Sequence, residues 1–430
     1  MVSCQGNISD VPVDGVCTGC GTCAAVCPAG AIEMCLNSRR GTFEPVVRAD
    51  QCTNCGLCRS CCPPITWSNR PATQSWHPCV GDYLDVFAVY STDERIRHQS
   101  ASGGFITSLL LYLVRNKVIT GAVVTRRRTD NPLLGQAFLA TKEEEILAAK
   151  GSKYIPIPFD EVLQMLLRSD IAQHRIAFVG LPCHIEGVSK ASEHFTNLQQ
   201  LTKFKIGIVC GRAPSIASYG YILKRLKISK SDVKQISNRG DGWPGFMTIT
   251  LKNDQIKKIP YGNNLACGMV LSSPLFTPLG CELCADPGGF SADVITCDAW
   301  LERFRNNHEG VNLVLVKNQQ VADILKRMER EGHLVLLESS LDEFLKANQG
   351  VMTQKLVNKQ VALALLVGRK ASNYSRKIVY RKKPSFYRKL RLLIYYLHIQ
   401  LLRQIDLTAS VIFLNFPALF YLKAARLLKR

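Results

Sequence analysis

Apolar residues in the middle of the chain follow two alternating patterns. Apolar runs of strand length occur at residues 85–90, 119–125, 175–180 and 205–209. Residues 104–116 and 159–168 instead repeat apolar positions at the spacing of an amphipathic helix. Strands that alternate with helices are typical of a layered α/β domain, so this pattern predicts a mixed or largely parallel sheet.

The two ends of the chain differ from this middle part. Residues 71–78 (PATQSWHP) are typical of a linker, and closely spaced cysteines and glycines precede them. Residues 369–430 contain 15 Lys or Arg and one acid, which is +14 of the net charge of +20 and leaves +6 for the rest. The basic character therefore belongs to the tail, and the body is not expected to bind nucleic acid.

The 18 cysteines indicate either disulfides or metal sites. Disulfide scaffolds are usually short secreted chains. This chain has 430 residues, and its start, MVSCQGNISDVPV, has neither the basic nor the apolar segment of a secretory signal. We therefore expect metal binding in a reducing compartment, the cytoplasm.

Two cysteine runs, at residues 17–28 and 52–63, share the spacing CxxCxxCxxxCP. In bacterial ferredoxins with two [4Fe-4S] clusters, three cysteines of such a run hold one cluster and the fourth holds the other. The predicted sets are Cys17, Cys20, Cys23 and Cys62, and Cys52, Cys55, Cys58 and Cys27. Zinc ribbons also use CxxC pairs, but a zinc site needs four ligands rather than two overlapping runs. The cysteines outside this spacing are Cys4, Cys35, Cys61 and Cys79, and Cys61 is expected to be a bystander.

Four later cysteines lie at the ends of predicted elements. Cys183 and Cys210 each follow a strand, and Cys281 and Cys284 form a CELC pair. Ligand sites of α/β sheets gather at the carboxyl ends of strands, so these cysteines are placed to converge. The alternative is a set of separate buried thiols.

Two glycine-containing segments are candidate anion-binding loops. Ser100-Ala101-Ser102-Gly103-Gly104 precedes the helix at 104–116, and Gly151-Ser152-Lys153 combines hydroxyl, backbone and ammonium donors. Neither is a Walker A loop or a GxGxxG motif. An ordinary helix cap or turn is the alternative for each.

Six stretches, in order along the chain, together resemble one protein family. They are Ser102-Gly103-Gly104, Lys150-Gly151-Ser152-Lys153-Tyr154, Leu181-Pro182-Cys183, Gly207-Ile208-Val209-Cys210, Arg239-Gly240-Asp241-Gly242-Trp243, and Cys281-Glu282-Leu283-Cys284-Ala285-Asp286 followed by Ala292-Asp293 and Asp298-Ala299-Trp300. Over roughly residues 80–345 the chain thus resembles the beta subunit of coenzyme F420-reducing hydrogenase and its relatives, which include 7-hydroxymethyl chlorophyll a reductase.

The resemblance implies a flavoprotein with a third [4Fe-4S] cluster, held by Cys183, Cys210, Cys281 and Cys284. It also implies FAD contacts from Ser102, Gly103, Gly104, Gly151, Ser152, Lys153 and Arg239. Two positions depart from the family pattern. Cys297 replaces a glycine, and His184, where glutamine is frequent, is expected to be an outward-facing or packed residue rather than a proton donor. The family has diverged in substrate, so the use of F420 does not follow.

We therefore predict an α+β protein. Its segments are a dicluster ferredoxin domain (1–70), a linker (71–80), a flavin and [4Fe-4S] domain with a mixed sheet (81–345), a basic connecting segment (346–384) and a basic helical tail (385–430). The predicted function is electron transfer between ferredoxin-type clusters and an organic substrate or deazaflavin through FAD, because a flavin takes up two electrons and releases them singly. No catalytic residue can be assigned.

Three kinds of partner are expected: an external electron carrier such as ferredoxin, a small-molecule substrate, and a second copy or a partner subunit. The alternatives to a self-contained enzyme are a flavin-free electron-transfer adaptor or redox sensor, and a subunit whose active site lies on another chain. In the tail, residues 392–402 and 407–422 are apolar and follow a basic segment with aromatics. Both are shorter than the roughly 20 residues of a spanning helix. They fit a helix pair on the inner face of the cell membrane or a hairpin packed on protein.

Overall fold

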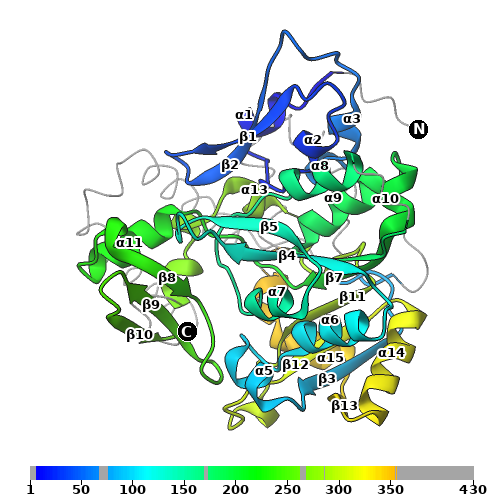
Figure 1. The fold of residues 1–430 in the computed structure, drawn as a ribbon, viewed down its shortest axis with the longest axis vertical. Coiled ribbons are helices and arrows are strands. Elements are labelled where there is room, and N and C mark those ends of the chain that lie inside the picture. The colour runs from blue at the N-terminus through cyan, green and yellow to red at the C-terminus, as the bar shows by residue number, and fades with distance from the viewer. Residues whose placement is uncertain are drawn as a thin grey trace, which may run out of the picture.

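An eight-stranded mixed sheet forms the centre of the protein (Figure 1), as seen in a computed structural model that describes residues 6–66, 76–168, 173–261, 268–284, 286–353 and 355. The strands lie in the order β13-β3-β12-β11-β7-β6-β4-β5. The inner pairs between β11, β7, β6 and β4 are parallel, and the pairs on either side are antiparallel. The strands are β3 (Asp85–Ser91), β4 (Gly121–Arg127), β5 (Gly135–Ala140), β6 (Ile176–Gly180), β7 (Thr202–Ile208), β11 (Val294–Asp298), β12 (Asn312–Val316) and β13 (Leu334–Glu338).

Both faces of this sheet are buried. Successive side chains of a strand point to opposite faces, so Ala122 and Val124 join one apolar core while Val123 joins the other. Burial on both faces explains why the central strands are continuous apolar runs in the sequence. The first core is covered by α6 (Phe105–Arg115) and α14 (Gln319–Arg330), and the second by α8 (Asp160–Arg168), α9 (Pro182–Ser192) and α10 (Thr196–Leu201).

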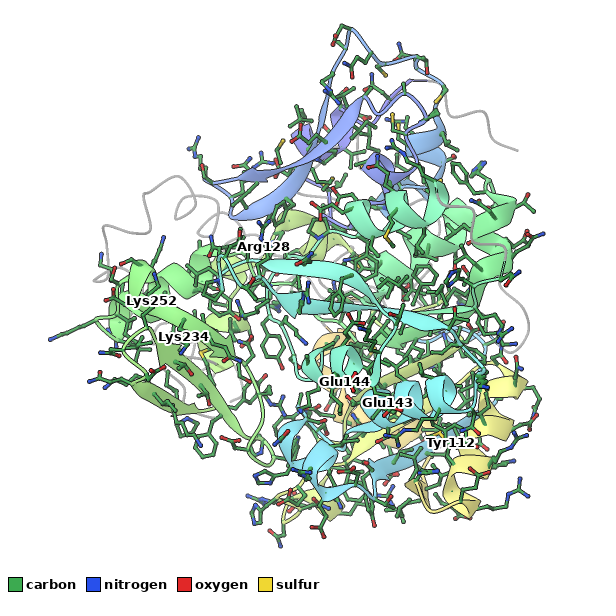
Figure 2. The ribbon with its side chains drawn as sticks, in the orientation of Figure 1. Tyr112, Arg128, Glu143, Glu144, Lys234 and Lys252 are labelled. Atoms are coloured by element: carbon green, nitrogen blue, oxygen red, sulfur yellow. The ribbon has the colours of Figure 1, made fainter. Side chains whose placement is uncertain are left out.

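A smaller antiparallel sheet lies beside the main one. Its strands, in the order β10-β9-β8, bury Met247 and Ile249 against the second core. Figure 2 shows Lys234 and Lys252 on this sheet at the edge of the molecule, and both side chains are exposed. The elements are β8 (Val233–Ser237), β9 (Phe246–Leu251), β10 (Ile256–Pro260) and the adjoining α11 (Ala217–Arg225).

The N-terminal module is a hairpin with short helices around it. The hairpin strands β1 (Ile32–Asn37) and β2 (Thr42–Val47) pair antiparallel. The helices are α1 (Asp10–Val13), α2 (Thr22–Ala25), α3 (Leu57–Ser60) and α4 (Pro63–Thr66). In Figure 1 this module, in blue, covers the end of the molecule where α8, α9 and α13 (Leu279–Leu283) lie.

The module packs closely on the main domain. The Phe159 N–H donates to the Cys20 carbonyl at 2.9 Å, and the Ile216 N–H donates to the Gly41 carbonyl at 2.8 Å. At Gly187 an added Cβ would lie 2.0 Å from Thr22 Oγ1. Such contacts leave no room for a side chain, so the cysteine loops of the module are held against the main domain.

The expected strands and helices of the middle part, and its mixed sheet, are confirmed with small shifts at their ends. The remaining elements are α5 (Glu94–Gln99), α7 (Glu143–Ala148), α12 (Gly268–Leu271), α15 (Leu341–Ala347), α16 (Gln349–Thr353), η1 (Lys230–Asp232), η2 (Pro274–Phe276) and η3 (Glu302–Phe304). The predicted basic tail at 385–430 lies outside the described residues. Within the described ranges, no helix combines the length and the apolar character needed to cross a membrane.

Candidate redox site

The cysteines of the N-terminal module surround two small cavities. One cavity is lined by Cys17, Cys20, Cys23 and Cys62, and the other by Cys27, Cys52, Cys55 and Cys58. Each set takes one member from the other run, which is the grouping that the ferredoxin spacing predicts. Gly19, Gly21 and Gly56 have positive φ angles of 71°, 85° and 78°, which glycine adopts without strain. These turns fold the backbone around each set, and the Gly19 N–H donates to Cys17 Sγ at 3.4 Å.

The surroundings of these thiols fit a metal cluster. Burial raises the pKa of the Cys17 thiol to about 12 and that of Cys58 to about 11. Iron binds the thiolate, and a buried thiolate needs positive charge beside it. The iron core of a [4Fe-4S] cluster supplies that charge, so the donor set and its burial suit such a group.

Cys61 is placed differently from its neighbour Cys62. It is fully buried in the apolar core between the module and α9, beside Ile185 and Val188, and it lines neither small cavity. Burial raises the pKa of its thiol to about 12. Cys61 therefore packs as an apolar side chain, in agreement with its expected role as a bystander.

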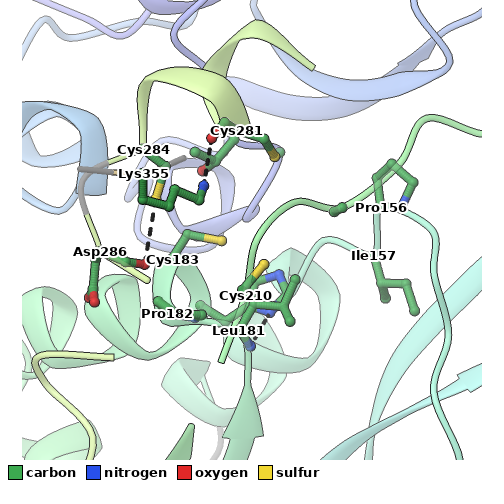
Figure 3. Close-up of a pocket in the computed structure, with 14 residues that line it drawn as sticks. Pro156, Ile157, Leu181, Pro182, Cys183, Cys210, Cys281, Cys284, Asp286 and Lys355 are labelled. Carbon is green, nitrogen blue, oxygen red and sulfur yellow. Dashed lines mark hydrogen bonds between the residues drawn. The ribbon is translucent and has the colours of Figure 1, made fainter. Parts of the chain in front are cut away.

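The four later cysteines also come together. Cys183 lies in the first turn of α9, Cys210 follows β7, Cys281 lies in α13, and Cys284 is the residue at which α13 ends. All four line one small cavity, which Figure 3 shows. Burial raises the pKa of Cys210 to about 12 and that of Cys183 well above its usual range. Cys281 and Cys284 are buried, and Cys183 and Cys210 are partly buried. The chemistry of the four thiols fits the same kind of group as in the N-terminal sets.

Lys355 is a member of this site that sequence reasoning missed. It lines the cavity of the third set, only 2 % of it is exposed, and its Nζ donates to the Cys281 carbonyl at 2.6 Å. Figure 3 shows its ammonium among the labelled cysteines. No spacing or motif distinguishes it from the other lysines of a basic segment, so the sequence carries no signal for it.

A cavity of about 320 Å³ lies next to the third set, at the carboxyl ends of the parallel strands. Its wall includes Val124 in β4, Gly180 at the end of β6, Val209 after β7 and Cys297 near the end of β11. This is the edge where ligands bind in open α/β sheets. Both predicted anion-binding loops reach it, through Ser102, Gly104, Gly151, Ser152 and Lys153.

The first loop contacts the cavity mainly through its backbone. Gly104, with φ of 79°, is the N-cap residue of α6, whose first turn also lines the cavity. The Ser102 hydroxyl donates to the Val311 carbonyl at 2.7 Å, and an added Cβ at Gly103 would lie 2.7 Å from the Val89 carbonyl oxygen. Ser100 differs: it lines the cavity, and its Oγ is buried with no hydrogen-bond partner in the described structure. An orphaned hydroxyl suits a polar ligand.

The two charged candidates, Lys153 of the second loop and Arg239, are used within the protein. The Lys153 ammonium donates to the carbonyls of Ala149, Lys150 and Gly151, and burial lowers its pKa to about 7. Arg239 does not line the cavity, because it lies behind the wall. It pairs with Asp298 at 3.0 Å and donates to the Ala101 carbonyl at 2.5 Å. Both cations therefore shape the cavity by fixing its walls.

Two side chains that depart from the family pattern lie on the same wall. His184 is stacked on Phe159 with ring centroids 4.0 Å apart, and its Nδ1 accepts from the Leu181 N–H at 3.2 Å. Burial lowers the pKa of His184 to about 4, so this histidine is neutral and packed. Cys297 lines the cavity and accepts from Asn348 Nδ2 at 3.0 Å.

The large cavity and the three cysteine sets are contiguous. Cys210, Leu181 and His184 line both the large cavity and the third set. The cavity of the third set is also lined by Thr18 and Gly19, which lie between Cys17 and Cys20 of the Cys17 set. The order is therefore cavity, third set, Cys17 set and Cys52 set, and Cys55 of the last set is exposed.

Comparison with known proteins identifies three matching regions. Residues 86–164 match the N-terminal part, and residues 173–340 the C-terminal part, of the family described as coenzyme F420 hydrogenase/dehydrogenase, beta subunit. Residues 16–64 match the 4Fe-4S dicluster domain. The N-terminal module thus binds iron–sulfur clusters.

Individual relatives agree with these matches. The coenzyme F420 hydrogenase subunit beta of Methanothermobacter thermautotrophicus is 23% identical over 65% of this chain and 92% of its own length. That of Methanosarcina barkeri is 26% identical over 51% and 72%. A chain of the F420-reducing [NiFe] hydrogenase complex from Methanosarcina barkeri superposes with a TM-score of 0.53 at 20% identity, over 68% of this chain and 96% of that one. This structural likeness concerns the fold.

Proposed function

The chain belongs to the coenzyme F420 hydrogenase/dehydrogenase beta-subunit family, and from this premise we propose that it is a flavin-dependent enzyme with three [4Fe-4S] clusters. That it is an iron–sulfur oxidoreductase follows from the family and from its dicluster domain. The proposal adds the cofactor of the large cavity, the third cluster and the order in which the sites exchange electrons.

One observation carries the proposal, namely the wall shared by the large cavity and the third cysteine set. Cys210 and Leu181 line both spaces, so a ligand in the cavity lies next to the metal site. Electron transfer needs such closeness, whereas an isolated structural cluster does not. The remaining sets continue from there to the exposed Cys55.

The cavity residues suit FAD. When bound, a flavin accepts two electrons as a hydride and passes them on singly to iron–sulfur centres. The positive end of α6, which follows Gly104, and the open backbone at Gly151 would hold its phosphates. Arg239 and Lys153 would keep the two loops in place through the carbonyls that they bind.

Each cysteine set would hold one cluster. The third cluster would use Cys183, Cys210, Cys281 and Cys284, and the two N-terminal clusters would use the Cys17 and Cys52 sets. The third set lies closest to the cavity, and the Cys52 set lies closest to solvent. An external carrier such as ferredoxin would therefore exchange electrons at the Cys52 set.

The substrate is proposed as an organic molecule that exchanges a hydride, of the same class as the coenzyme F420 that appears in the names of the relatives. Those relatives are named as hydrogenase subunits, so a partner subunit that supplies or consumes the electrons is part of the proposal. A protein that is active alone, as a monomer, would exclude that requirement.

Anaerobic purification tests the proposal directly. About twelve iron atoms per chain and one flavin that survives desalting are expected, since three clusters carry four iron atoms each. A content of eight iron atoms per chain would contradict the presence of a third cluster. Twelve iron atoms without flavin would favour the flavin-free electron-transfer adaptor instead.

A further inference from the structure

The segment that follows α15 returns to the third cysteine set. Phe344 and Met352 are buried in one core with Cys297, and Asn348 donates to Cys297 Sγ at 3.0 Å. Val351 lies against Gly211, where an added Cβ would be 3.2 Å from its Cγ2. Because Gly211 directly follows Cys210, these contacts bring the chain to the cavity of the third set, where Lys355 lies.

Lys355 is a charged side chain in a buried place. Its exposed fraction is 2 %, and its Nζ donates to the Cys281 carbonyl, which carries no net charge. Lys355 also lies in the wall of the cavity that Cys183, Cys210, Cys281 and Cys284 line. An ammonium in that place favours negative charge on the surrounding sulfur atoms.

The other charged side chains near this cavity have partners of their own. Asp286 also lines it, and its carboxylate accepts from the Phe290 N–H at 3.0 Å. Glu282 is next to Cys281 in α13, and its Oε1 lies 4.0 Å from the Arg212 guanidinium. Arg212 also donates to Thr277 Oγ1 at 3.1 Å. Among the described residues that line the cysteine cavity, Lys355 is the one lysine.

We propose that Lys355 is a built-in counter-charge for the third cluster, which makes that cluster easier to reduce. The inference rests on the third cluster of the proposed function. A [4Fe-4S] core of charge 2+ with four thiolates carries a net charge of 2−, and uptake of one electron makes it 3− without forming or breaking a bond. A nearby ammonium stabilises the more negative form more strongly, and burial weakens the screening of this interaction.

The proposal implies that the reduction potentials differ between the three clusters. A more easily reduced third cluster is a better acceptor for electrons that arrive from the adjoining cavity. Among the described residues, neither N-terminal cavity has a lysine in its wall. The counter-charge is therefore specific to the set beside the large cavity.

Replacement of Lys355 by Met tests this, because Met keeps the length and removes the charge. Reductive titration followed by electron paramagnetic resonance should show one of three centres, the one lost in Cys281→Ser, harder to reduce. The expected change is at least tenfold in the one-electron equilibrium, or about 59 mV, with the other two midpoints unchanged. Lys355→Arg should keep the wild-type midpoint.

Lys317→Met is the matched control, because Lys317 also donates to backbone carbonyls, those of Val80 and Gly289, but lines no cysteine cavity. The proposal is overturned if the midpoint potential of the third cluster is unchanged in Lys355→Met, or if Lys317→Met shifts it equally. If Lys355→Met loses four iron atoms, their retention in Lys355→Arg supports the charge, and their loss in both variants overturns it. A wild-type protein with eight iron atoms instead contradicts the third cluster itself.

Discussion

The N-terminal cysteine sets and the third set are assembled by the chain in different ways. The N-terminal sets come from residues 17–62, where each triplet occupies a single short loop. The third set comes from α9, the end of β7 and α13, and Lys355 adds a fourth segment. A local set can be recognised from spacing, whereas a dispersed set exists only after the main sheet has formed. The third set should therefore depend on the fold far more than the N-terminal sets do.

The sets also differ in their surroundings. Cys55 of the outer set is exposed, whereas Cys281 and Cys284 are buried next to a buried ammonium. Burial and nearby charge are the main means by which a protein adjusts a cluster potential. Under the proposed function, the Cys52 set is the outer end that would meet partners, and the third set is the inner end whose potential the fold would adjust.

The largest expected effect comes from Cys281→Ser. This change should remove about four of about twelve iron atoms and abolish one electron paramagnetic resonance signal, while the N-terminal clusters remain. Electron transfer from the large cavity to an external carrier should then fail, because the inner end of the line is missing. Iron analysis and spectra of the reduced protein measure both.

Cys61→Ser is the control for that change. Cys61 is buried and adjacent to a ligand candidate, but it lines no cysteine cavity, so about twelve iron atoms should remain. Loss of all clusters in Cys281→Ser would mean that the three sets fold as one unit. Retention of every iron atom would remove Cys281 from the ligand set.

The difference between local and dispersed features also explains which parts of the structure could be predicted from the sequence. The strands around Val123 and Phe178 are apolar on both faces, which makes them visible as short runs, and the spacing of Cys17 to Cys62 encodes its own grouping. Lys355 was missed because its role depends on a chain segment that returns over α13. The small sheet was missed because β10 exposes most of its side chains and carries little apolar signal.

The orientation of side chains in the cavity also escaped sequence reasoning. The motifs placed Ser102 and Lys153 at a ligand, but the Ser102 hydroxyl binds Val311 and the Lys153 ammonium binds carbonyls of its own loop. A motif specifies a loop shape, and the groups that hold this shape need not touch the ligand. Ser100 is not among the residues of the family motifs, yet it has the hydroxyl that remains without a hydrogen-bond partner within the described structure.

The second effect concerns the junction between the first N-terminal set and the third set. At Gly280 an added Cβ would lie 2.1 Å from the Cys17 carbonyl oxygen, so Gly280→Ala must push the module away. We expect a loss of about 3 kcal/mol or more in the free energy of unfolding, since the clash is with backbone. Electron transfer between the two sets should also slow, which rapid-mixing spectroscopy can follow.

Gly350→Ala is the matched substitution, because an added Cβ at Gly350 would meet nothing within 4 Å. It should change neither stability nor transfer rate appreciably. If Gly280→Ala were equally silent, the close contact between module and main domain would not persist in solution.

The third effect is a dependence of this junction on pH. Burial raises the pKa of Asp160 to about 6, and its backbone nitrogen lies 2.7 Å from where a Cβ on Gly21 would be. An unfolded aspartate has a pKa of about 3.9, so the folded chain holds this proton more tightly. The contribution to stability is present below pH 4 and is lost as the pH rises from about 4 to about 6.

Asp160→Asn should therefore stabilise the protein at pH 8 by about 2 kcal/mol and have little effect at pH 4. Thermal unfolding across this pH range measures the difference. Glu161→Gln, at the exposed neighbouring position, removes only the charge that adds to the effect of burial on the pKa of Asp160, so its gain at pH 8 should be smaller. Equal gains at pH 4 and pH 8 would assign the effect of Asp160→Asn to helix propensity rather than to a buried charge.

The smallest effect separates two serines of one loop. Ser100→Ala removes a buried hydroxyl without a partner, so the flavin-free protein should keep its stability or gain about 1 kcal/mol. Ser102→Ala breaks the hydrogen bond to the Val311 carbonyl and should lower the free energy of unfolding by about 1–3 kcal/mol.

The affinity for flavin should respond to the two substitutions in the opposite order. It should weaken by up to about tenfold in Ser100→Ala, since one hydrogen bond to the ligand is lost, and change less in Ser102→Ala. Fluorescence titration of the desalted variants with FAD gives both affinities. If Ser100→Ala binds FAD as tightly as the wild type, the orphaned hydroxyl is not a flavin contact, and the loop would then position FAD through its backbone and α6 alone.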